Sequence, residues 1–318
     1  MIEVTGLNLL LKKDRVLLPL LKNINFHLAA GRTLGIIGES GSGKTLIAYA
    51  LLGLLNRTDG LTGSIELFGT GNILAGNRRE VLQTRRQKIG YVPQDPQGSL
   101  TPTQRIGAQL REVVEVKTGL SRQRAALQAA ELLTRVGFRE PQQIMSKYPH
   151  QLSGGMCQRV AVAMAIAGAP ELIVADEPTS NLDMLSKKEI MALLQQAQTE
   201  LACTMVIVTH DLEPALQYCD TLAVFYSGQL VEMGAVREGS FNPRHPYTKD
   251  LLSCFFHELA GNPLRFVPAD PPPLYERLKG CRYAHCCSEC RPRCREEEPP
   301  TRRFLDGLVL CWLNGGGE

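Results

Sequence analysis

The sequence predicts an α/β fold: a parallel-sheet core, an inserted helical segment and a small cysteine-rich C-terminal extension. Residues 1–92 and 171–235 alternate apolar runs typical of buried strands with helical patterns, which favours a parallel sheet. Residues 93–170 between them have helical periodicity. Six of the ten cysteines lie at or beyond residue 281, inside the predicted extension of residues 236–318. We therefore predict three regions with these boundaries.

The most informative motif follows a predicted strand at residues 33–37. It fits the phosphate-binding loop pattern of two glycines flanking four residues and then Lys-Thr: Gly38-Glu39-Ser40-Gly41-Ser42-Gly43-Lys44-Thr45. Glycines let backbone N–H groups surround a phosphate, and the helix predicted over 45–52 points its positive end at it. Lys44 adds a full charge for the β- and γ-phosphates, and the Thr45 hydroxyl can ligate magnesium. All eight residues are predicted nucleotide contacts.

Two further strands end in candidate catalytic residues. The apolar run at 172–175 is followed by Asp176 and Glu177. Asp176 is suited to hold a magnesium shell, and Glu177 is our candidate general base, because hydrolysis needs a carboxylate that polarises water. The predicted strand at 204–208 leads into Thr209-His210-Asp211.

Helix signals organise the middle of the chain. Ser153 is a good N-cap for a helix predicted from 156 to about 167, and Gly154 and Gly155 leave N–H groups open to an anion. Ser186 and Glu189 form a capping-box pattern for the helix after Asp183.

Three other elements are expected from the same kind of pattern. Ile106, Leu110, Val113 and Val114 share one predicted helical face. A second helix has Ala126, Ala130 and Leu133 on one face and ends at Gly137. A Ser227-Gly228 turn joins strands predicted at 222–226 and 229–233 into a hairpin.

Composition limits the choice of partner and compartment. The 35 Lys and Arg against 32 Asp and Glu are too small an excess to indicate nucleic acid. No segment resembles a signal peptide, and apolar runs such as 16–21 and 161–167 are too short to cross a bilayer. We expect a chain of cytosolic origin that serves a membrane only by docking on a separate spanning protein.

The motifs occur in a fixed order, with Gln94 in Tyr91-Val92-Pro93-Gln94-Asp95-Pro96 between the phosphate loop and the Leu-Ser-Gly-Gly run. The set resembles the nucleotide-binding subunit of an ATP-binding-cassette (ABC) transporter. The resemblance implies a P-loop NTPase fold, with a RecA-like core and a helical subdomain, that binds ATP and Mg²⁺ and hydrolyses ATP. It implies that Glu177 is the base, that His210 contacts the γ-phosphate and attacking water, and that Gln94 serves catalysis and magnesium. Asp176 keeps its magnesium role.

The same resemblance implies a second cassette. Ser153, Gly154 and Gly155 would meet the γ-phosphate of ATP held by the opposite subunit. Two departures from the family pattern stand out. Asn181 occupies a place where relatives commonly have Ala, which leaves cross-talk between the two sites open. No aromatic residue precedes Phe26 to stack on adenine, so Arg15 or Val16 would cover the base.

Two segments narrow the family. Gln94-Asp95-Pro96-Gln97-Gly98-Ser99-Leu100-Thr101-Pro102 and His245-Pro246-Tyr247-Thr248 resemble segments in subunits of peptide, opine and nickel importers, although a Pro-rich stretch is also typical of a surface turn. The resemblance implies a paralogous second ATP-binding subunit, two transmembrane permease subunits and an extracytoplasmic substrate-binding protein. It places the chain at the cytoplasmic face of the inner membrane, as a peripheral subunit importing peptides, nickel, metal chelates or opines.

The cysteines beyond residue 280 indicate metal or redox chemistry, because disulfides are improbable in the cytosol. Cys281, Cys287, Cys294 and Cys311 have the order and spacing of a C-terminal region on many peptide-importer subunits, and the resemblance implies a 4Fe–4S cluster there. Four thiolates suit structural zinc equally well. Cys286 and Cys290 are extra thiols that create alternative ligand sets, and a reduced cysteine-rich tail without metal is the other alternative. Because a Pro-rich linker at 268–273 precedes this region, we expect cluster loss to weaken assembly more than ATP binding.

Two other function classes remain as alternatives at this point. One is a soluble ABC ATPase of repair or translation that acts on nucleic acid, although such proteins usually fuse two cassettes and carry basic faces. The other is a redox or metal-sensing module that has lost hydrolysis, which the intact Lys44, Asp176 and Glu177 disfavour.

Overall fold

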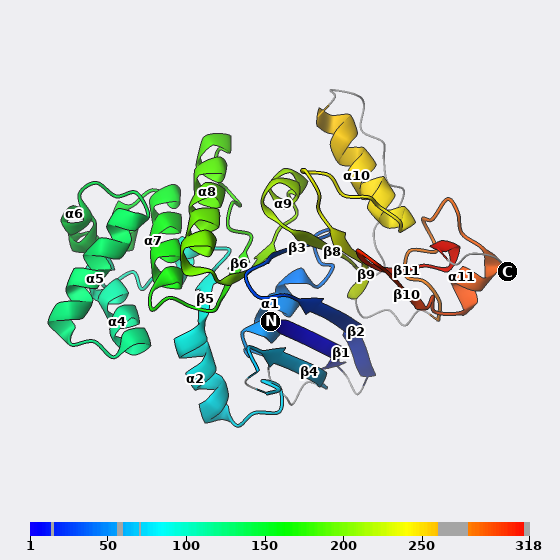
Figure 1. Cartoon of the computed structure of the whole chain (residues 1–318), viewed down its shortest axis with the longest axis horizontal. Helices are drawn as coiled ribbons and strands as arrows, with labels where there is room; N and C mark the ends of the chain where they lie inside the picture. Colours follow the sequence, from blue (N-terminus) through cyan, green and yellow to red (C-terminus); the bar gives the residue numbers. More distant parts are fainter. Residues whose placement is uncertain (14–15, 56–59, 70, 260–278, 315–318) are drawn as a thin grey trace. The chain divides into compact units, whose positions relative to one another are not determined.

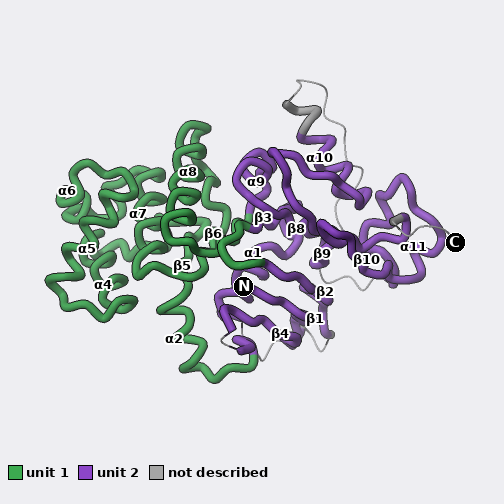
Figure 2. The backbone as a smooth tube through the Cα atoms, viewed as in Figure 1, with its two compact units in different colours: residues 1, 29–33, 75–208 green, residues 2–28, 34–74, 209–318 purple. Residues whose placement is uncertain are grey.

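The computed structural model of this chain describes all residues except 14–15, 56–59, 70, 260–278 and 315–318 (Figure 1). The described chain divides into two compact units, coloured separately in Figure 2. Unit 1 holds residues 1, 29–33 and 75–208, and unit 2 holds residues 2–28, 34–74 and 209–318. The three regions predicted from the sequence, 1–92 with 171–235, 93–170 and 236–318, have different boundaries from these units. They stay a prediction.

Unit 2 contains a mixed sheet in the order β10-β11-β9-β8-β3. Strand β3 (Thr33–Ile37) runs parallel to β8 (Thr221–Tyr226), and all five of its residues are buried, as the unbroken apolar run predicts. β8 and β9 (Gln229–Ala235) form the predicted hairpin around Ser227-Gly228, both at positive φ. The C-terminal strands β10 (Thr301–Phe304) and β11 (Gly307–Leu310), which the sequence reading did not predict, extend the sheet antiparallel beyond β9.

The N-terminal strands of unit 2 do not join a parallel sheet as we expected. β1 (Ile2–Lys13), β2 (Val16–Leu28) and β4 (Thr62–Leu67) form a separate antiparallel sheet in the order β2-β1-β4. Alternation of apolar and polar residues gives this sheet one buried face, where Phe26 is only 5% exposed. The helices of unit 2 are α1 (Lys44–Leu51), α9 (Leu212–Tyr218), α10 (Pro246–Leu259), α11 (Pro292–Glu296) and the 3₁₀ turn η3 (Trp312–Asn314).

Unit 1 contains three parallel strands in the order β7-β6-β5. They are β5 (Ile89–Val92), β6 (Leu172–Asp176) and β7 (Thr204–Val208); the last two are buried at every residue. Its helices are α2 (Arg78–Lys88), α3 (Pro96–Ser99), α4 (Ile106–Thr118), α5 (Arg122–Arg135), α6 (Pro141–Ser146), α7 (Gly154–Ile166), α8 (Met184–Leu201) and the 3₁₀ turn η2 (Pro149–Gln151). Helices α3 to α7 lie within residues 93–170, where the sequence pattern predicts helices.

The buried face of α5 differs by one residue from the prediction. Ala125 and Ala129 are fully buried, together with Leu132 and Leu133, whereas Ala126 and Ala130 are partly exposed. Paired alanines at both positions make the two faces equally apolar in sequence, and packing selects one of them. In the described part of the chain no helix is both long and apolar enough to span a bilayer.

Candidate nucleotide site and cysteine pocket

The phosphate loop of unit 2 has the conformation its glycines predict. Gly38, Gly41 and Gly43 have φ values of 145°, 77° and 98°, in the region that side-chain-bearing residues avoid. A Cβ atom on Gly38 would lie 2.2 Å from the carbonyl oxygen of Phe225. The loop therefore needs glycine at Gly38 for space as well as for backbone freedom.

Lys44 lies folded over its own loop. Its Nζ donates hydrogen bonds to the carbonyl oxygens of Gly38 at 2.9 Å and Glu39 at 2.8 Å, and the residue is only 5% exposed. The Oγ of Ser42 is buried without a hydrogen-bond partner among the described residues. A cation over a glycine loop and an unsatisfied buried hydroxyl beside it fit the phosphates of a nucleotide.

Helix α1 begins directly behind this loop. Its N-cap is Gly43, which has no side chain to cap the first turn, and that turn contains Thr45. The positive end of the helix dipole therefore lies directly behind the loop. The helix ends at Leu51, one residue before the predicted end, and Gly53 follows with a φ of 62°.

Two contacts hold the outer side of the loop. The backbone N–H of Glu39 donates to the Tyr247 hydroxyl at 3.2 Å. The backbone N–H of Gly228 donates to the carbonyl of Ser42 at 2.9 Å. Both contacts come from unit 2, so the β8–β9 turn and the start of α10 shape the loop.

Unit 1 brings Gln94 and Asp176 to the same edge of its sheet. β5 and β6 are parallel, with Val92 paired to Ala175, so both residues follow neighbouring carboxyl ends. The Ser180 hydroxyl donates to the carbonyl of Gln94 at 3.4 Å, which joins the segments that follow the two strands. Asp176 is 1% exposed, whereas the Gln94 side chain is exposed.

Glu177 has an unusual backbone. Its φ is 46°, which costs energy for any residue other than glycine, and strained residues of this kind cluster at functional sites. Asn181, four residues later, also has a positive φ of 60°. The strain fits the assignment of this segment to catalysis. His210, in unit 2, is exposed after Thr209, whose hydroxyl accepts from the N–H of Asp211 at 2.9 Å.

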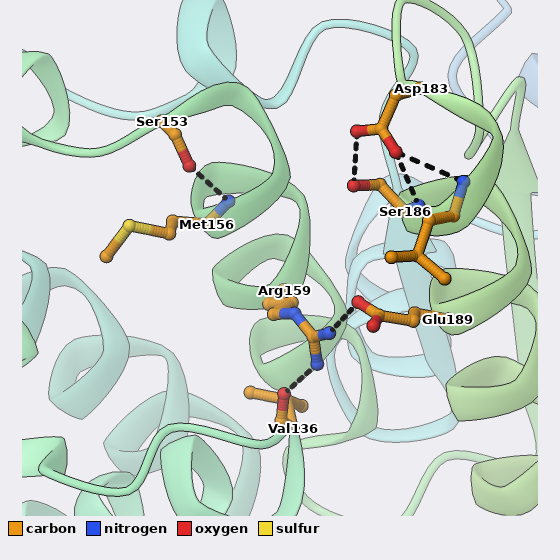
Figure 3. A network of polar contacts seen from close by, with 8 residues as sticks. Val136, Ser153, Met156, Arg159, Asp183, Ser186 and Glu189 are labelled. Atoms are coloured by element: carbon orange, nitrogen blue, oxygen red, sulfur yellow. Dashed lines mark hydrogen bonds and ion pairs between the residues drawn. The ribbon is translucent and has the colours of Figure 1, made fainter.

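The Leu-Ser-Gly-Gly run opens helix α7, as predicted, but two residues earlier than the predicted start. The Ser153 hydroxyl accepts from the N–H of Met156 at 3.3 Å (Figure 3). A Cβ on Gly154 would meet no described atom within 4 Å, and one on Gly155 only the Ser186 hydroxyl at 4.0 Å. Packing within the chain therefore does not require these glycines.

The predicted capping box at Ser186 and Glu189 is wrong. Asp183 is the N-cap of α8, and its carboxylate accepts from the N–H groups of Leu185 at 3.1 Å and Ser186 at 3.0 Å (Figure 3). The Ser186 hydroxyl donates to the same carboxylate at 2.6 Å. Glu189 instead pairs with Arg159 of α7 at 2.6 Å, because the two helices pack together. Asp183, three residues before Ser186, is itself a preferred N-cap residue and stands where the helix begins.

Four cysteines of the C-terminal region line one small pocket in unit 2: Cys281, Cys287, Cys294 and Cys311. Cys286 and Cys290, the extra thiols, are not among its lining residues. Burial and the neighbouring thiols raise the pKa of Cys281 to about 12, and burial raises that of Cys287 to about 11. Buried thiols of this kind ionise when a metal supplies the opposite charge.

The pocket is small, with a cavity volume of about 20 Å³. Among the described residues no three His, Cys, Asp or Glu side chains converge closely enough to hold one metal ion. His245 and Trp312 complete the wall of the pocket, and the binding of a metal group by its four thiols stays a prediction.

The sequence reading missed an aromatic cluster behind the phosphate loop. Tyr226, Tyr247 and Tyr283 are buried with ring centroids 4.6–5.4 Å apart. His245 is 1% exposed, so its motif is part of the core and not a surface turn. The His245-Pro246-Tyr247-Thr248 run, which contains one of the three tyrosines, was the only sequence feature we had noted that could have indicated this cluster. Arg15 lies outside the described residues, and the Val16 side chain is not described, so the cover of adenine stays a prediction.

The fold and the phosphate loop define a P-loop ATPase cassette. Among solved structures, the ATP-binding cassette MJ0796 in a dimeric post-hydrolysis state with ADP and Pi is similar, with a TM-score of 0.68 at 28% identity, covering 76% of this chain and 100% of that one. Residues 21–180 match the ABC transporter family, and residues 231–294 match the oligopeptide/dipeptide transporter C-terminal region.

Curated relatives agree with these matches. The oligopeptide transport ATP-binding protein OppD of Salmonella typhimurium is 38% identical over 90% of this chain and 85% of its own length. The dipeptide transport ATP-binding protein DppD of Lactococcus lactis is 37% identical over 88% and 81%. The chain belongs to the ABC transporter ATP-binding subunits of oligopeptide/dipeptide type and is an ABC ATPase that binds ATP with Mg²⁺. These relatives give no support to a role on nucleic acid or to nickel transport.

Proposed function

We propose that this chain binds and hydrolyses ATP to energise the import of short peptides. The substrate class rests on one observation: the chain matches both the ABC transporter family and the oligopeptide/dipeptide transporter C-terminal region. The second match covers α10 and most of the cysteine region. The buried His245-Pro246-Tyr247-Thr248 run supports it, because the motif shared with importer subunits is part of the core of unit 2.

The roles of the nucleotide-site residues follow their chemistry. Lys44 and the N–H groups of the loop from Gly38 to Thr45 bind the phosphates, and Thr45, Gln94 and Asp176 hold magnesium. Glu177 orients and polarises the attacking water, and His210 contacts the γ-phosphate. The glycine conformations, the buried Asp176 and the strained backbone of Glu177 support these roles.

A second ATP-binding subunit, a paralogue in our proposal, completes each site. Ser153 and Gly154 are exposed at the start of α7, and Gly154 has open space where a side chain would stand. Met184 and Leu185 at the start of α8 are 70% and 69% exposed, an unusual position for two large apolar residues. A partner surface and its nucleotide would cover these positions.

The permease subunits have a candidate docking site on unit 1. A groove beside the segment that follows Gln94 is lined by Tyr91, Leu100, Val113, Val116, Lys117 and Met164, among others. Val116 is 51% exposed. We propose that a short helix of a permease subunit lies in this groove, which places the chain at the cytoplasmic face of the membrane beside a substrate-binding protein outside it.

The cysteine pocket is proposed to hold a 4Fe–4S cluster through Cys281, Cys287, Cys294 and Cys311. Such a group would supply a covalent staple for a segment whose only α-helix among the described residues beyond 278 is the five-residue α11. The shared pocket and the exclusion of Cys286 and Cys290 from its lining support this ligand set. Zinc bound to the same thiolates is the alternative.

Transport in reconstituted vesicles tests the proposal. The full complex, with a peptide-loaded binding protein, should take up labelled short peptides only with ATP, and unlabelled peptides should compete. Peptide-independent uptake of nickel or a metal chelate by the same complex would contradict the substrate class. Lys44→Ala is the matched inactive control, because it removes the phosphate-binding cation while keeping the loop glycines.

A further inference from the structure

The run His245-Pro246-Tyr247-Thr248 has no part in the nucleotide chemistry described above, yet it contacts the phosphate loop within unit 2. The backbone N–H of Glu39 donates to the Tyr247 hydroxyl at 3.2 Å. His245 and Tyr247 are each 1% exposed, and Thr248 is fully buried. The run is therefore a candidate for holding the loop in place.

The peptide unit between Gly38 and Glu39 is held from both sides. Its N–H donates to the Tyr247 hydroxyl, and its carbonyl oxygen accepts from the Lys44 Nζ at 2.9 Å. The described residues contain no cis peptide bond. In a trans peptide the N–H and C=O point in opposite directions, so the tyrosine hydroxyl lies on one side of this unit and the lysine amine on the other. Tyr247 and Lys44 therefore act on one rigid, planar group.

Gly38 makes such a hold necessary. Its φ of 145° lies in a region that residues with a Cβ avoid, and a glycine backbone rotates more freely than that of any other residue. The peptide unit that follows it is consequently not fixed by its own geometry. In the observed orientation its N–H points toward the buried Tyr247, where a backbone donor needs an acceptor. The hydroxyl supplies that acceptor and so stabilises the orientation in which the carbonyl faces Lys44.

The next carbonyl of the loop completes the seat of the lysine. The carbonyl oxygen of Glu39 accepts from the Lys44 Nζ at 2.8 Å and from the N–H of Ser42 at 3.2 Å. Two consecutive carbonyls therefore set the position of the amine, and Tyr247 holds the peptide unit of the first. The tyrosine acts on Lys44 through the loop backbone.

The aromatic cluster fixes the ring of Tyr247. Its centroid lies 4.6 Å from that of Tyr226 and 5.4 Å from that of Tyr283. The Tyr283 hydroxyl donates to Asp250 of α10 at 2.6 Å, which ties this ring to the same helix that carries Tyr247. Tyr283 comes from the cysteine region, so this region packs on the core of unit 2 behind the loop.

The start of α10 fixes the backbone of Tyr247. The carboxylate of Glu232 on β9, 2% exposed, accepts from the N–H groups of Arg244 at 2.7 Å and His245 at 2.9 Å. Nδ1 of His245 accepts from the N–H of Tyr247 at 3.1 Å. Pro246 opens the helix, where the missing N–H costs nothing. Ring and backbone are thus both fixed, which leaves the hydroxyl little freedom to follow a moving loop.

We propose that Tyr247 is a positioning residue for ATP binding: its hydroxyl fixes the peptide unit between Gly38 and Glu39 and thereby places Lys44 for the phosphates. The proposal rests on the proposed roles of the loop and of Lys44. A loop held in its binding conformation loses less conformational freedom when nucleotide binds, so its affinity is higher. Because the tyrosine acts on the loop backbone and not on reacting groups, its loss weakens binding of substrate and transition state alike.

Tyr247→Phe removes the hydroxyl and keeps the ring. In the full chain, the affinity for MgATP measured by calorimetry should fall about fivefold, the effect of one hydrogen bond between neutral groups. In the assembled transporter the KM for ATP should rise by a similar factor while kcat stays within about twofold of the wild type. Tyr218→Phe makes the same chemical change on α9, outside the aromatic cluster, and is the matched control that should keep wild-type affinity.

Hydrogen–deuterium exchange distinguishes positioning from a general loss of stability. Tyr247→Phe should speed amide exchange in the loop from Gly38 to Gly43 and leave exchange in the buried strand β6 unchanged, because the packing of the ring is kept. Faster exchange throughout the chain, with affinity and kcat falling together, would make Tyr247 a residue of general stability and would reject the positioning role.

Two further results overturn the proposal. Wild-type MgATP affinity in Tyr247→Phe rejects it, and so does a lower kcat with an unchanged KM. Lys44→Ala separates this failure from that of the proposed function. If Lys44→Ala binds MgATP as tightly as the wild type, the role of the loop lysine itself is wrong. If Lys44→Ala binds weakly and Tyr247→Phe binds normally, only the positioning role fails.

Discussion

The backbone N–H of Glu177 donates a hydrogen bond to the carbonyl oxygen of Val208 at 2.8 Å, at the residue where the chain adopts a positive φ of 46°. This bond joins the ends of β6 and β7 in unit 1 and holds Glu177 in a conformation that a non-glycine residue adopts only at a cost. The positive φ of Glu177 supports its candidacy as the general base, and that role stays a proposal.

Glu177→Gln should lower ATP hydrolysis by at least ~10²-fold while MgATP still binds, because the amide keeps the shape but cannot polarise water. Steady-state turnover and nucleotide affinity are measured on the same preparation with the partner subunits present. Glu131→Gln makes the same chemical change at an exposed position of α5 and should leave turnover unchanged. Near-normal turnover in Glu177→Gln would contradict the assignment of the base.

Gly155→Asp should abolish turnover of the assembled transporter without reducing ATP binding to the isolated chain. The added Cβ has space, since its nearest described neighbour is the Ser186 hydroxyl at 4.0 Å, so the charge rather than a clash opposes the partner's γ-phosphate. Gly155→Ala adds the Cβ alone and should be much milder. If the isolated Gly155→Asp chain loses ATP affinity, the glycine serves its own nucleotide and the shared-site proposal fails.

Each single replacement of Cys281, Cys287, Cys294 or Cys311 by Ser should remove the broad visible absorption of the anaerobically purified protein. We expect about four irons per chain in the unaltered protein. Cys290→Ser is the matched control, because Cys290 does not line the pocket, and it should keep both colour and iron. A colourless protein with zinc but no iron would replace the cluster with a structural zinc site.

Lys117 should react with acylating reagents at an unusually low pH. Burial lowers its pKa to about 8, and its Nζ donates to the carbonyl of Ile89 at 2.8 Å. The reactive neutral amine therefore forms near pH 8, against about 10.4 for an ordinary lysine. Mass spectrometry of labelling between pH 7 and 11 measures this, and labelling that rises only near pH 10 would contradict it.

The same lysine tests the docking groove. Lys117 lines the groove proposed for a permease helix, so assembly should protect it from the reagent. Lys188 of α8, which lies outside the lining of that groove, serves as the reference site.

The lowered pKa of Lys117 also affects the pH dependence of stability. Between pH values of about 8 and 10.5 the unfolded chain binds more protons at this lysine than the folded chain does. The free energy of unfolding therefore rises with pH through that window.

Local patterns predicted the elements of the ATPase well. β3, β6 and β7 follow from unbroken apolar runs, and the helices after Gly43 and Ser153 follow from glycine and capping signals. These signals depend on a few consecutive residues, so one sequence contains them. The antiparallel pairing of β1 with β2 and β4 was missed, because an apolar pattern indicates a strand but does not specify which strands it pairs with or in which direction.

Side-chain choices between equivalent positions needed the packed structure. Ala125 and Ala126 are indistinguishable by pattern, and only the neighbouring helices make Ala125 the buried one. Ser186 fitted a capping box, but Asp183 is the N-cap of α8 and its carboxylate accepts from the N–H groups of Leu185 and Ser186. The sequence offers both residues as N-caps, and only the position at which the helix begins decides between them.

By itself the sequence determined the class of chemistry, since the order from Lys44 through Gln94 and Ser153 to Glu177 requires residue types that only nucleotide hydrolysis uses together. Only the tertiary structure decided what lies behind the phosphate loop. Residues more than two hundred positions apart, Glu39 and Tyr247, meet through one hydrogen bond, and Tyr283 joins them from beyond the residues that the structure leaves undescribed. Such long-range contacts depend on how many residues of the chain pack together to bury apolar surface. No single motif therefore predicts them.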